Sequence, residues 1–202
     1  MSVFIAIDGP NGVGKSTLID KLALKLKESY DVYTTKEPSD SVLGNRVRKN
    51  EENIRGWDYA KLISEDRKWH LENEILPQLG KCDIVISDRY IASSLALQAY
   101  DGVPIDDIWN LNKEFFLPDI NVILLAEEDV IENRLGQREH LTFFEKRMSR
   151  YQELNYYKDA DTFLKQKGVN SILLYNNSEN DLDTNIAKLV KIINCIYNDH
   201  NS

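Results

Sequence analysis

Short apolar runs alternate with longer stretches of helical periodicity along this chain. The apolar runs have the length and β-branched content of buried strands, and they lie at residues 3–7, 32–35, 84–87, 122–125 and 172–175. The stretches between them predict helices over about residues 15–29, 58–76, 129–135, 141–158 and 182–197, with one or two more holding residues 105–116. In the first helix Leu18, Leu22 and Leu26 form one apolar stripe. Pro77 is expected to end the second.

This order of elements predicts the fold class. Strands that are apolar throughout and alternate with helices indicate a parallel sheet covered on both faces. We therefore expect an α/β fold with three layers, α/β/α, around a five-stranded parallel sheet. The sequence contains no linker-like segment, so a single domain over residues 1–202 is expected. Ligands of such sheets bind beyond the carboxyl ends of the strands.

Composition and charge narrow the range of partners. The formal net charge of −8 does not suit a protein that binds nucleic acid polymers, although it allows a local basic cleft for a small phosphorylated substrate. No apolar run approaches the length of a membrane span, so no membrane association is expected. The two cysteines, Cys82 and Cys195, suggest neither a disulfide framework nor a zinc site. A reducing cytoplasm fits best.

The clearest motif follows the first predicted strand. The segment from Gly9 to Ser16 matches the phosphate-binding pattern G-x4-GK[ST], with a strand before it and a helix after it. Glycines allow successive backbone N–H groups to face phosphate oxygens, and the helix dipole favours an anion. Lys15 is expected to reach the β- and γ-phosphates of ATP, and Ser16 to help hold Mg²⁺. The residues expected to contact the nucleotide here are Asn11, Gly12, Val13, Gly14, Lys15, Ser16 and Thr17. For Thr17, packing in the first helical turn is equally compatible.

An acid and an arginine follow the third predicted strand. Asp88 stands where it could act on a magnesium ion, directly or through water. The neighbouring Arg89 could bind an acceptor phosphate with two parallel hydrogen bonds. A salt bridge between Asp88 and Arg89 on the surface is the alternative.

Several longer motifs together resemble the bacterial-type thymidylate kinases, a group of P-loop nucleoside monophosphate kinases. The resemblance covers roughly residues 3–157 and is most specific between Asp88 and Gln98. It rests on Ile7-Asp8-Gly9-x4-Gly14-Lys15-Ser16-Thr17, Thr35-Lys36-Glu37-Pro38, Asp66-Arg67, Glu74-Ile75-Leu76-Pro77, Ser87-Asp88-Arg89-Tyr90-x2-Ser93-Ser94-Leu95-Ala96-x-Gln98, and Phe144-Glu145-Lys146 leading to Tyr151.

The resemblance implies a P-loop kinase that converts ATP and thymidine monophosphate to ADP and the diphosphate with Mg²⁺, and that forms a homodimer. It implies that Arg89 holds the acceptor phosphate, with Arg48 reaching the same region, and that Arg67 binds the thymine ring. Further acceptor-site positions that it implies are Glu37, Ser94 and Gln98. Each has a structural alternative: a turn before Pro38 for Glu37, a solvated helix residue for Arg48, pairing with Glu65 or Asp66 for Arg67, and an interior amide for Gln98.

A short lid is implied at about residues 134–142. Position 12 is glycine, so a cation for the transferring phosphoryl has to come from elsewhere. The resemblance implies that Arg138 supplies it and that Arg134 lies near the adenine or the phosphates. Two arginines with a structural role at the end of a helix are the alternative. His70, in a helix rich in charged residues, is expected to be exposed.

Four departures from the family pattern are visible, most of them on the acceptor side. Ile63 stands where a stacking phenylalanine is usual, and it lines the pocket without an aromatic ring. Asn11 replaces an acid, although it can still hydrogen-bond a sugar hydroxyl. Ser39 and Asp40 replace two glycines, and a carboxylate there would repel an acceptor phosphate. Leu125 replaces an acid.

Two other functions therefore stay open from the sequence. A deoxynucleoside kinase would phosphorylate an uncharged 5′-hydroxyl, although such enzymes carry Glu-Arg where this chain has Asp88-Arg89. A P-loop protein that binds nucleotide without turnover would explain the four departures. The intact Lys15, Ser16 and Asp88 argue against it.

Overall fold

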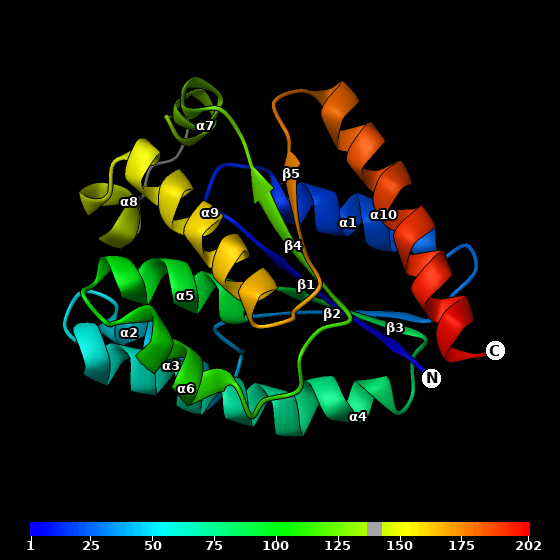
Figure 1. Ribbon diagram of the computed structural model, residues 1–202, viewed down its shortest axis with the longest axis horizontal. Coiled ribbons are helices and arrows are strands. Elements are labelled where there is room, and N and C mark those ends of the chain that lie inside the picture. The colour runs from blue at the N-terminus through cyan, green and yellow to red at the C-terminus, as the bar shows by residue number, and fades with distance from the viewer. Residues whose placement is uncertain (137–142) are drawn as a thin grey trace.

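The computed structural model of the chain describes residues 1–136 and 143–202, and its centre is a five-stranded sheet (Figure 1). The strand order is β2-β3-β1-β4-β5, and every neighbouring pair is parallel. The strands are β1 (Val3–Asp8), β2 (Val32–Lys36), β3 (Ile84–Asp88), β4 (Ile120–Leu125) and β5 (Ser171–Tyr175). The predicted five-stranded parallel sheet is therefore confirmed.

Helices cover both faces of the sheet. α1 and α10 pack together on one face, and α5 and α9 pack together on the other (Figure 1). The helices are α1 (Lys15–Leu26), α2 (Val42–Asn50), α3 (Gly56–His70), η1 (Leu71–Ile75), α4 (Leu76–Leu79), α5 (Ile91–Tyr100), α6 (Ile105–Asn112), α7 (Glu128–Leu135), α8 (Phe143–Arg147), α9 (Arg150–Gln166) and α10 (Glu179–His200). None of the helices in the described part of the chain is long and apolar enough to cross a bilayer.

The hydrophobic core lies between the sheet and these helices. The three central strands, β1, β3 and β4, are buried almost throughout, and Leu18, Leu22 and Leu26 of α1 face them as the stripe predicts. The expectation that every strand is apolar throughout is wrong for β2. That strand lies at the edge of the sheet, so Thr34 and Lys36 face solvent.

The prediction that Pro77 ends the long second helix is wrong. The helical path continues to Leu79 through the π-helical turn η1. The wider π-helical turn changes the hydrogen-bond pattern, and a new α-helical segment, α4, begins after it. Pro77 lies in the first turn of α4. A residue there needs no backbone N–H, because that group has no partner within the helix.

Two other helix boundaries depend on caps. The single helix expected over residues 141–158 is divided, because the Ser149 hydroxyl accepts a hydrogen bond from the Gln152 N–H and starts α9 with a capping box. The sequence reading also missed α2. Its first turn is capped by Ser41, whose hydroxyl accepts from the Gly44 N–H at 3.1 Å.

Candidate active site

The phosphate-binding loop joins the central strand β1 to α1. Gly14 ends the loop with φ of 93°, a left-handed conformation that favours glycine. A side chain at Gly9 would place a Cβ 2.1 Å from the Leu124 carbonyl oxygen, so the loop lies directly against β4. Val13 is buried, which leaves only its backbone for a ligand, and Thr17 is exposed. The loop therefore has the backbone form that cradles phosphate.

Lys15 lies almost buried under this loop. Its Nζ donates to the Pro10 carbonyl oxygen at 2.7 Å. Burial, and then the positive charge of Arg89, lower the pKa of Lys15 to about 7. Among the described residues the ammonium group hydrogen-bonds a carbonyl oxygen and no carboxylate, so its charge is available for a phosphate.

Ser16 and Asp88 meet beside the loop. In the sheet Asp88 is the partner of Ile7, so β3 carries its carboxylate to the end of β1. The Ser16 hydroxyl donates to Asp88 Oδ2 at 3.3 Å. Asp88 Oδ1 is buried and finds no hydrogen-bond partner in the described part of the chain. Two oxygens next to a phosphate loop, one of them unpaired, fit a Mg²⁺ ion completed by phosphate oxygens and water. The protein itself provides no larger cluster, since the described residues contain no group of three possible metal ligands from His, Cys, Asp and Glu.

Arg89 lies between the phosphate-binding loop and a neighbouring cavity, and it lines both. Its backbone is left-handed, with φ of 74°. Its Nη2 donates to Asn11 Oδ1 at 2.6 Å, and its Nη1 to Tyr157 Oη at 2.9 Å and Ser93 Oγ at 3.1 Å. The guanidinium group is thus held by the phosphate-binding loop, α5 and α9, and not by a salt bridge to Asp88.

Sequence reasoning missed the part played by Tyr157. The residue lies in α9, is fully buried, and bonds both Arg89 and Ser93, the latter at 3.2 Å. Burial raises the pKa of Tyr157 to about 12, so the hydroxyl keeps its proton. Only the packing of α9 on α5 brings this hydroxyl to Arg89, and no local motif signals that contact.

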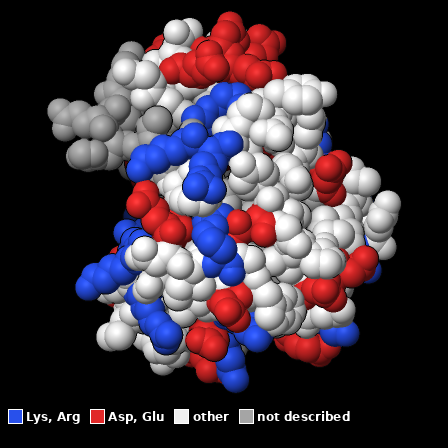
Figure 2. Space-filling view, turned by 90° about the vertical axis from the view of Figure 1, so that its left-hand side faces the viewer, with Lys and Arg blue, Asp and Glu red and all other residues white. Residues whose placement is uncertain are grey.

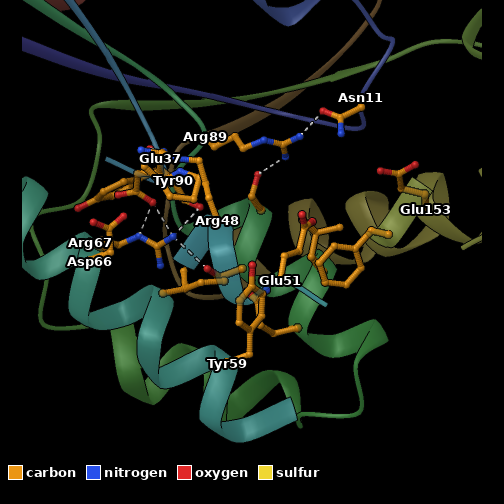
Figure 3. A pocket seen from close by; sticks show the side chains of 17 residues that line it. Asn11, Glu37, Arg48, Glu51, Tyr59, Asp66, Arg67, Arg89, Tyr90 and Glu153 are labelled. Atoms are coloured by element: carbon orange, nitrogen blue, oxygen red, sulfur yellow. Dashed lines mark hydrogen bonds and ion pairs between the residues drawn. The ribbon is translucent and has the colours of Figure 1, made fainter. Parts of the chain in front are cut away.

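A second cavity opens on the other side of Arg89 (Figure 3). Figure 3 shows Arg89 and Asn11 at one end of it, Arg67 with Glu37 on one wall, and Tyr59 away from Arg89. The cavity is lined by Asn11, Glu37, Pro38, Arg48, Glu51, Tyr59, Ile63, Asp66, Arg67, Arg89, Tyr90, Ser93, Ser94, Leu97, Gln98, Phe144 and Glu153. The structure thus brings together every acceptor-side residue that the resemblance implies.

Arg67 is buried, so the expected alternative of a surface pair with Glu65 or Asp66 is wrong. Its Nε and Nη2 donate to Glu37 Oε2 at 2.9 and 2.7 Å, and its Nη1 donates to Asn112 Oδ1 at 2.6 Å. Nη2 also contacts the Ser94 hydroxyl at 2.9 Å and the Tyr90 carbonyl oxygen at 3.0 Å. Burial alone would raise the pKa of Glu37, but Arg67 and His70 outweigh it and hold that pKa below its ordinary value.

The expected exposure of His70 is wrong as well. Its side chain is fully buried and lies between Glu37 and Glu74. The charged residues near it in sequence suggested a solvated face, but α3 presents this face to the end of β2.

The Ser39-Asp40 departure does not place a negative charge in the acceptor cavity. The Asp40 carboxylate is 72% exposed and lies 3.3 Å from Lys36 Nζ and 3.4 Å from Arg48 Nη2. The Ser39 hydroxyl donates to the buried Asp66 carboxylate at 2.5 Å. Arg48 binds the Pro38 and Ser39 carbonyl oxygens at 2.6 and 2.7 Å. The expected repulsion of an acceptor phosphate by Asp40 is therefore not supported.

The Ile63 departure leaves aromatic side chains elsewhere in the cavity. Tyr59 lies one helical turn before Ile63 on α3, and Phe144 reaches the same cavity from α8. These residues belong to a small hydrophobic cluster with Val47, Leu62 and Met148. Gln98 is buried, and its Oε1 has no hydrogen-bond partner in the described ranges.

The lid region is described only in part. Arg134 Nη1 donates to the Gly12, Val13 and Asn176 carbonyl oxygens at 3.4, 3.2 and 3.0 Å, so it braces the outer side of the phosphate loop. Arg138 and the rest of the expected lid to residue 142 lie outside the described residues. Leu125 is buried at the end of β4.

The charge distribution agrees with a site for anions. Despite the net charge of −8, Lys and Arg side chains gather along the middle of one face of the molecule, with acidic groups above, beside and below them (Figure 2). A local basic cleft is therefore compatible with an acidic protein.

Comparisons with known proteins agree with this geometry. The family model described as thymidylate kinase matches residues 7–186. A probable thymidylate kinase of Caldivirga maquilingensis is 38% identical, covering 72% of this chain and 74% of its own length. The thymidylate kinase of Staphylococcus epidermidis is 33% identical, covering 76% and 84%. The crystal structure of thymidylate kinase from Ehrlichia chaffeensis has the same fold, with a TM-score of 0.72, 24% identity, and coverage of 95% of this chain and 98% of that one. The chain therefore belongs to the thymidylate kinase family, a family of nucleoside monophosphate kinases.

Proposed function

We propose that this chain transfers the γ-phosphoryl group of ATP to the 5′-phosphate of dTMP, giving ADP and dTDP. The observation that carries the proposal is the position of Arg89, Asn11 and Glu37, which line both the phosphate-loop cavity and the acceptor cavity. Two nucleotides bound in these cavities would meet at Arg89. Phosphoryl transfer depends mainly on such positioning and on stabilising charge.

The donor side follows from the loop. Backbone N–H groups from Asn11 to Thr17 bind the phosphates, and Lys15 lies against the β- and γ-phosphates. Ser16 and Asp88 hold Mg²⁺. When bound, the ion offsets negative charge on the phosphate oxygens. Arg134 keeps the loop in shape from outside. We propose that Arg138, outside the described residues, adds a cation to the transferring group.

On the acceptor side, Arg89 holds the attacking phosphate. That phosphate is already anionic, so no general base has to remove a proton from it. Arg48 closes the same end of the cavity by fixing the Pro38–Ser39 segment. Asn11, which orients Arg89, is close enough to the cavity to meet the sugar.

Arg67 and Gln98 are suited to the base. Arg67 has five N–H groups. Its contacts with the described residues use the one on Nε and one on Nη1, and three contacts share the two on Nη2. Within the described part of the chain, one Nη1 hydrogen is left for a base carbonyl. Gln98 and Ser94 lie along the same wall, and Ile63 with Tyr59 and Phe144 gives it an apolar surface.

Two broader proposals accompany this function. We propose a homodimer formed through the α3–η1–α4 segment, where Trp57 and Leu76 are exposed by 41% and 42%. Light scattering after gel filtration should give a mass near twice the 23.4 kDa of one chain. We also propose that the protein works in the cytoplasm, a proposal supported by its two free cysteines.

A coupled ADP-release assay tests the function. Mg·ATP is supplied with a panel of nucleosides and nucleoside monophosphates, and dTMP should give the highest kcat/KM. Turnover with nucleosides alone would instead indicate a deoxynucleoside kinase. ATP binding without turnover on any acceptor would indicate a nucleotide-binding protein that has lost activity.

A further inference from the structure

His70 is a buried histidine at the end of α3, and its ring touches three side chains. Its Nδ1 lies 3.3 Å from Glu37 Oε1, and its Nε2 lies 2.7 Å from Thr35 Oγ1 and 3.5 Å from Glu74 Oε2. Burying a polar ring costs free energy unless its nitrogens form hydrogen bonds. The contacts of the two ring nitrogens therefore help to hold the neighbouring side chains in place.

The hydrogen bonds show which ring nitrogen holds Glu37. The Thr35 hydroxyl lies 2.7 Å from His70 Nε2 and donates to Glu74 Oε2 at 2.8 Å. Glu37 is ionised, because Arg67 binds its other oxygen, and an ionised carboxylate only accepts. His70 Nδ1 therefore has to donate to Glu37.

The charged groups around the ring come from three elements. Glu37 follows β2, Glu74 lies in η1 with 24% of its side chain exposed, and Arg67 of α3 binds the other oxygen of Glu37. Tyr33 of β2 also interacts with Glu74. The ring therefore lies between a buried carboxylate on its Nδ1 side and a partly exposed one on its Nε2 side.

We propose that His70, through the N–H of Nδ1, is a positioning residue that fixes Glu37 and, through it, the base-binding Arg67. Glu37 Oε1 is held by His70 and Oε2 by Arg67, so the carboxylate cannot turn. With Oε1 unpaired, it would rotate toward Arg67 and draw the guanidinium away from the base. The inference rests on the proposed role of Arg67.

Matched variants test the positioning role. His70→Asn retains a donor near the place of Nδ1, whereas His70→Leu removes both donors. A hydrogen bond to a charged group corresponds to about ten- to a hundredfold in a binding constant. His70→Leu should raise KM for dTMP by about that factor with KM for ATP nearly unchanged, and His70→Asn should restore most of the affinity. His200→Gln, near the end of α10 and far from His70 in sequence, is the control; its side chain is 29% exposed. Equal KM for dTMP in the wild type and His70→Leu would overturn the proposal.

Nitrogen-15 NMR of the wild-type protein tests the donor directly. The His70 ring is assigned by the loss of its signals in His70→Asn, and Nδ1 should carry a proton. A bare Nδ1 would overturn the proposal. Arg67→Lys separates the two ideas: an unchanged KM for dTMP in that variant would refute the role of Arg67, whereas a raised KM there with an unchanged KM in His70→Leu would refute the positioning role alone.

Discussion

Raising the pH above 7 should weaken nucleotide binding, because Lys15 binds phosphate only in its protonated form. Lys15 is 6% exposed, and burial followed by the charge of Arg89 lowers its pKa to about 7, although Asp88, Glu153 and Asp8 act in the opposite direction. Bound phosphates place negative charge beside Nζ and bring its pKa back toward the ordinary 10.5. Binding therefore takes up a proton wherever the free protein has lost it.

The size of this uptake follows from the lowered pKa. At pH 8 about nine in ten Lys15 side chains of the free protein are neutral, so each nucleotide should bind with about 0.9 proton. The affinity should fall about tenfold between pH 8 and pH 9, which corresponds to about 1.4 kcal/mol. Terminal phosphates have a second pKa of about 6, so at pH 8 the nucleotide itself hardly takes part.

Calorimetry measures this uptake directly. Mg·ADP is titrated at pH 8 in two buffers that differ in ionisation enthalpy, and the difference between the two heats gives the protons taken up. Lys15→Arg is the control, because a guanidinium stays charged and should take up almost none. Arg89→Ala should reduce the uptake, since the charge of Arg89 helps to lower the Lys15 pKa. Equal and negligible uptake in the wild type and Lys15→Arg would refute the reasoning.

Three further substitutions test the site and the fold. Arg89→Ala should remove most activity and leave ATP affinity nearly unchanged; a collapse of ATP binding, measured by fluorescence titration, would contradict the role given to Arg89. Tyr157→Phe removes a 2.9 Å hydrogen bond to Arg89 and should raise KM for dTMP about tenfold with little effect on KM for ATP; steady-state kinetics would reject this if both constants moved together. Gly44→Ala places a Cβ 1.9 Å from the Ser39 carbonyl oxygen, so thermal unfolding should show a loss of about 2 kcal/mol or more, and an unchanged midpoint would show that α2 moves aside freely.

Local chemistry made much of this protein readable from its sequence. A strand, a glycine loop and a helix are consecutive in the chain, so the phosphate loop from Gly9 to Ser16 could be identified without any tertiary contact. The alternation of apolar runs and helices was enough for the five-stranded parallel sheet, because parallel strands require crossovers. One predicted helix boundary was wrong because the residue is compatible with two local structures. A proline such as Pro77 can follow the end of a helix or lie in the first turn of one.

The tertiary structure decided which side chains contact each other on the acceptor side. Arg67 and Glu37 are 30 positions apart, and Arg89 and Tyr157 are 68 apart, so no local pattern specifies either pair. The same holds for His70, which a charged helix sequence suggested was solvated, and for Asp40, which was expected to repel a phosphate. Where a charged side chain points depends on which surface its helix or loop presents to the core, and only the packing of α3, α5 and α9 against the sheet determines that surface. The sequence by itself thus determined the nucleotide loop and the order of the elements, and the packing determined which charges meet.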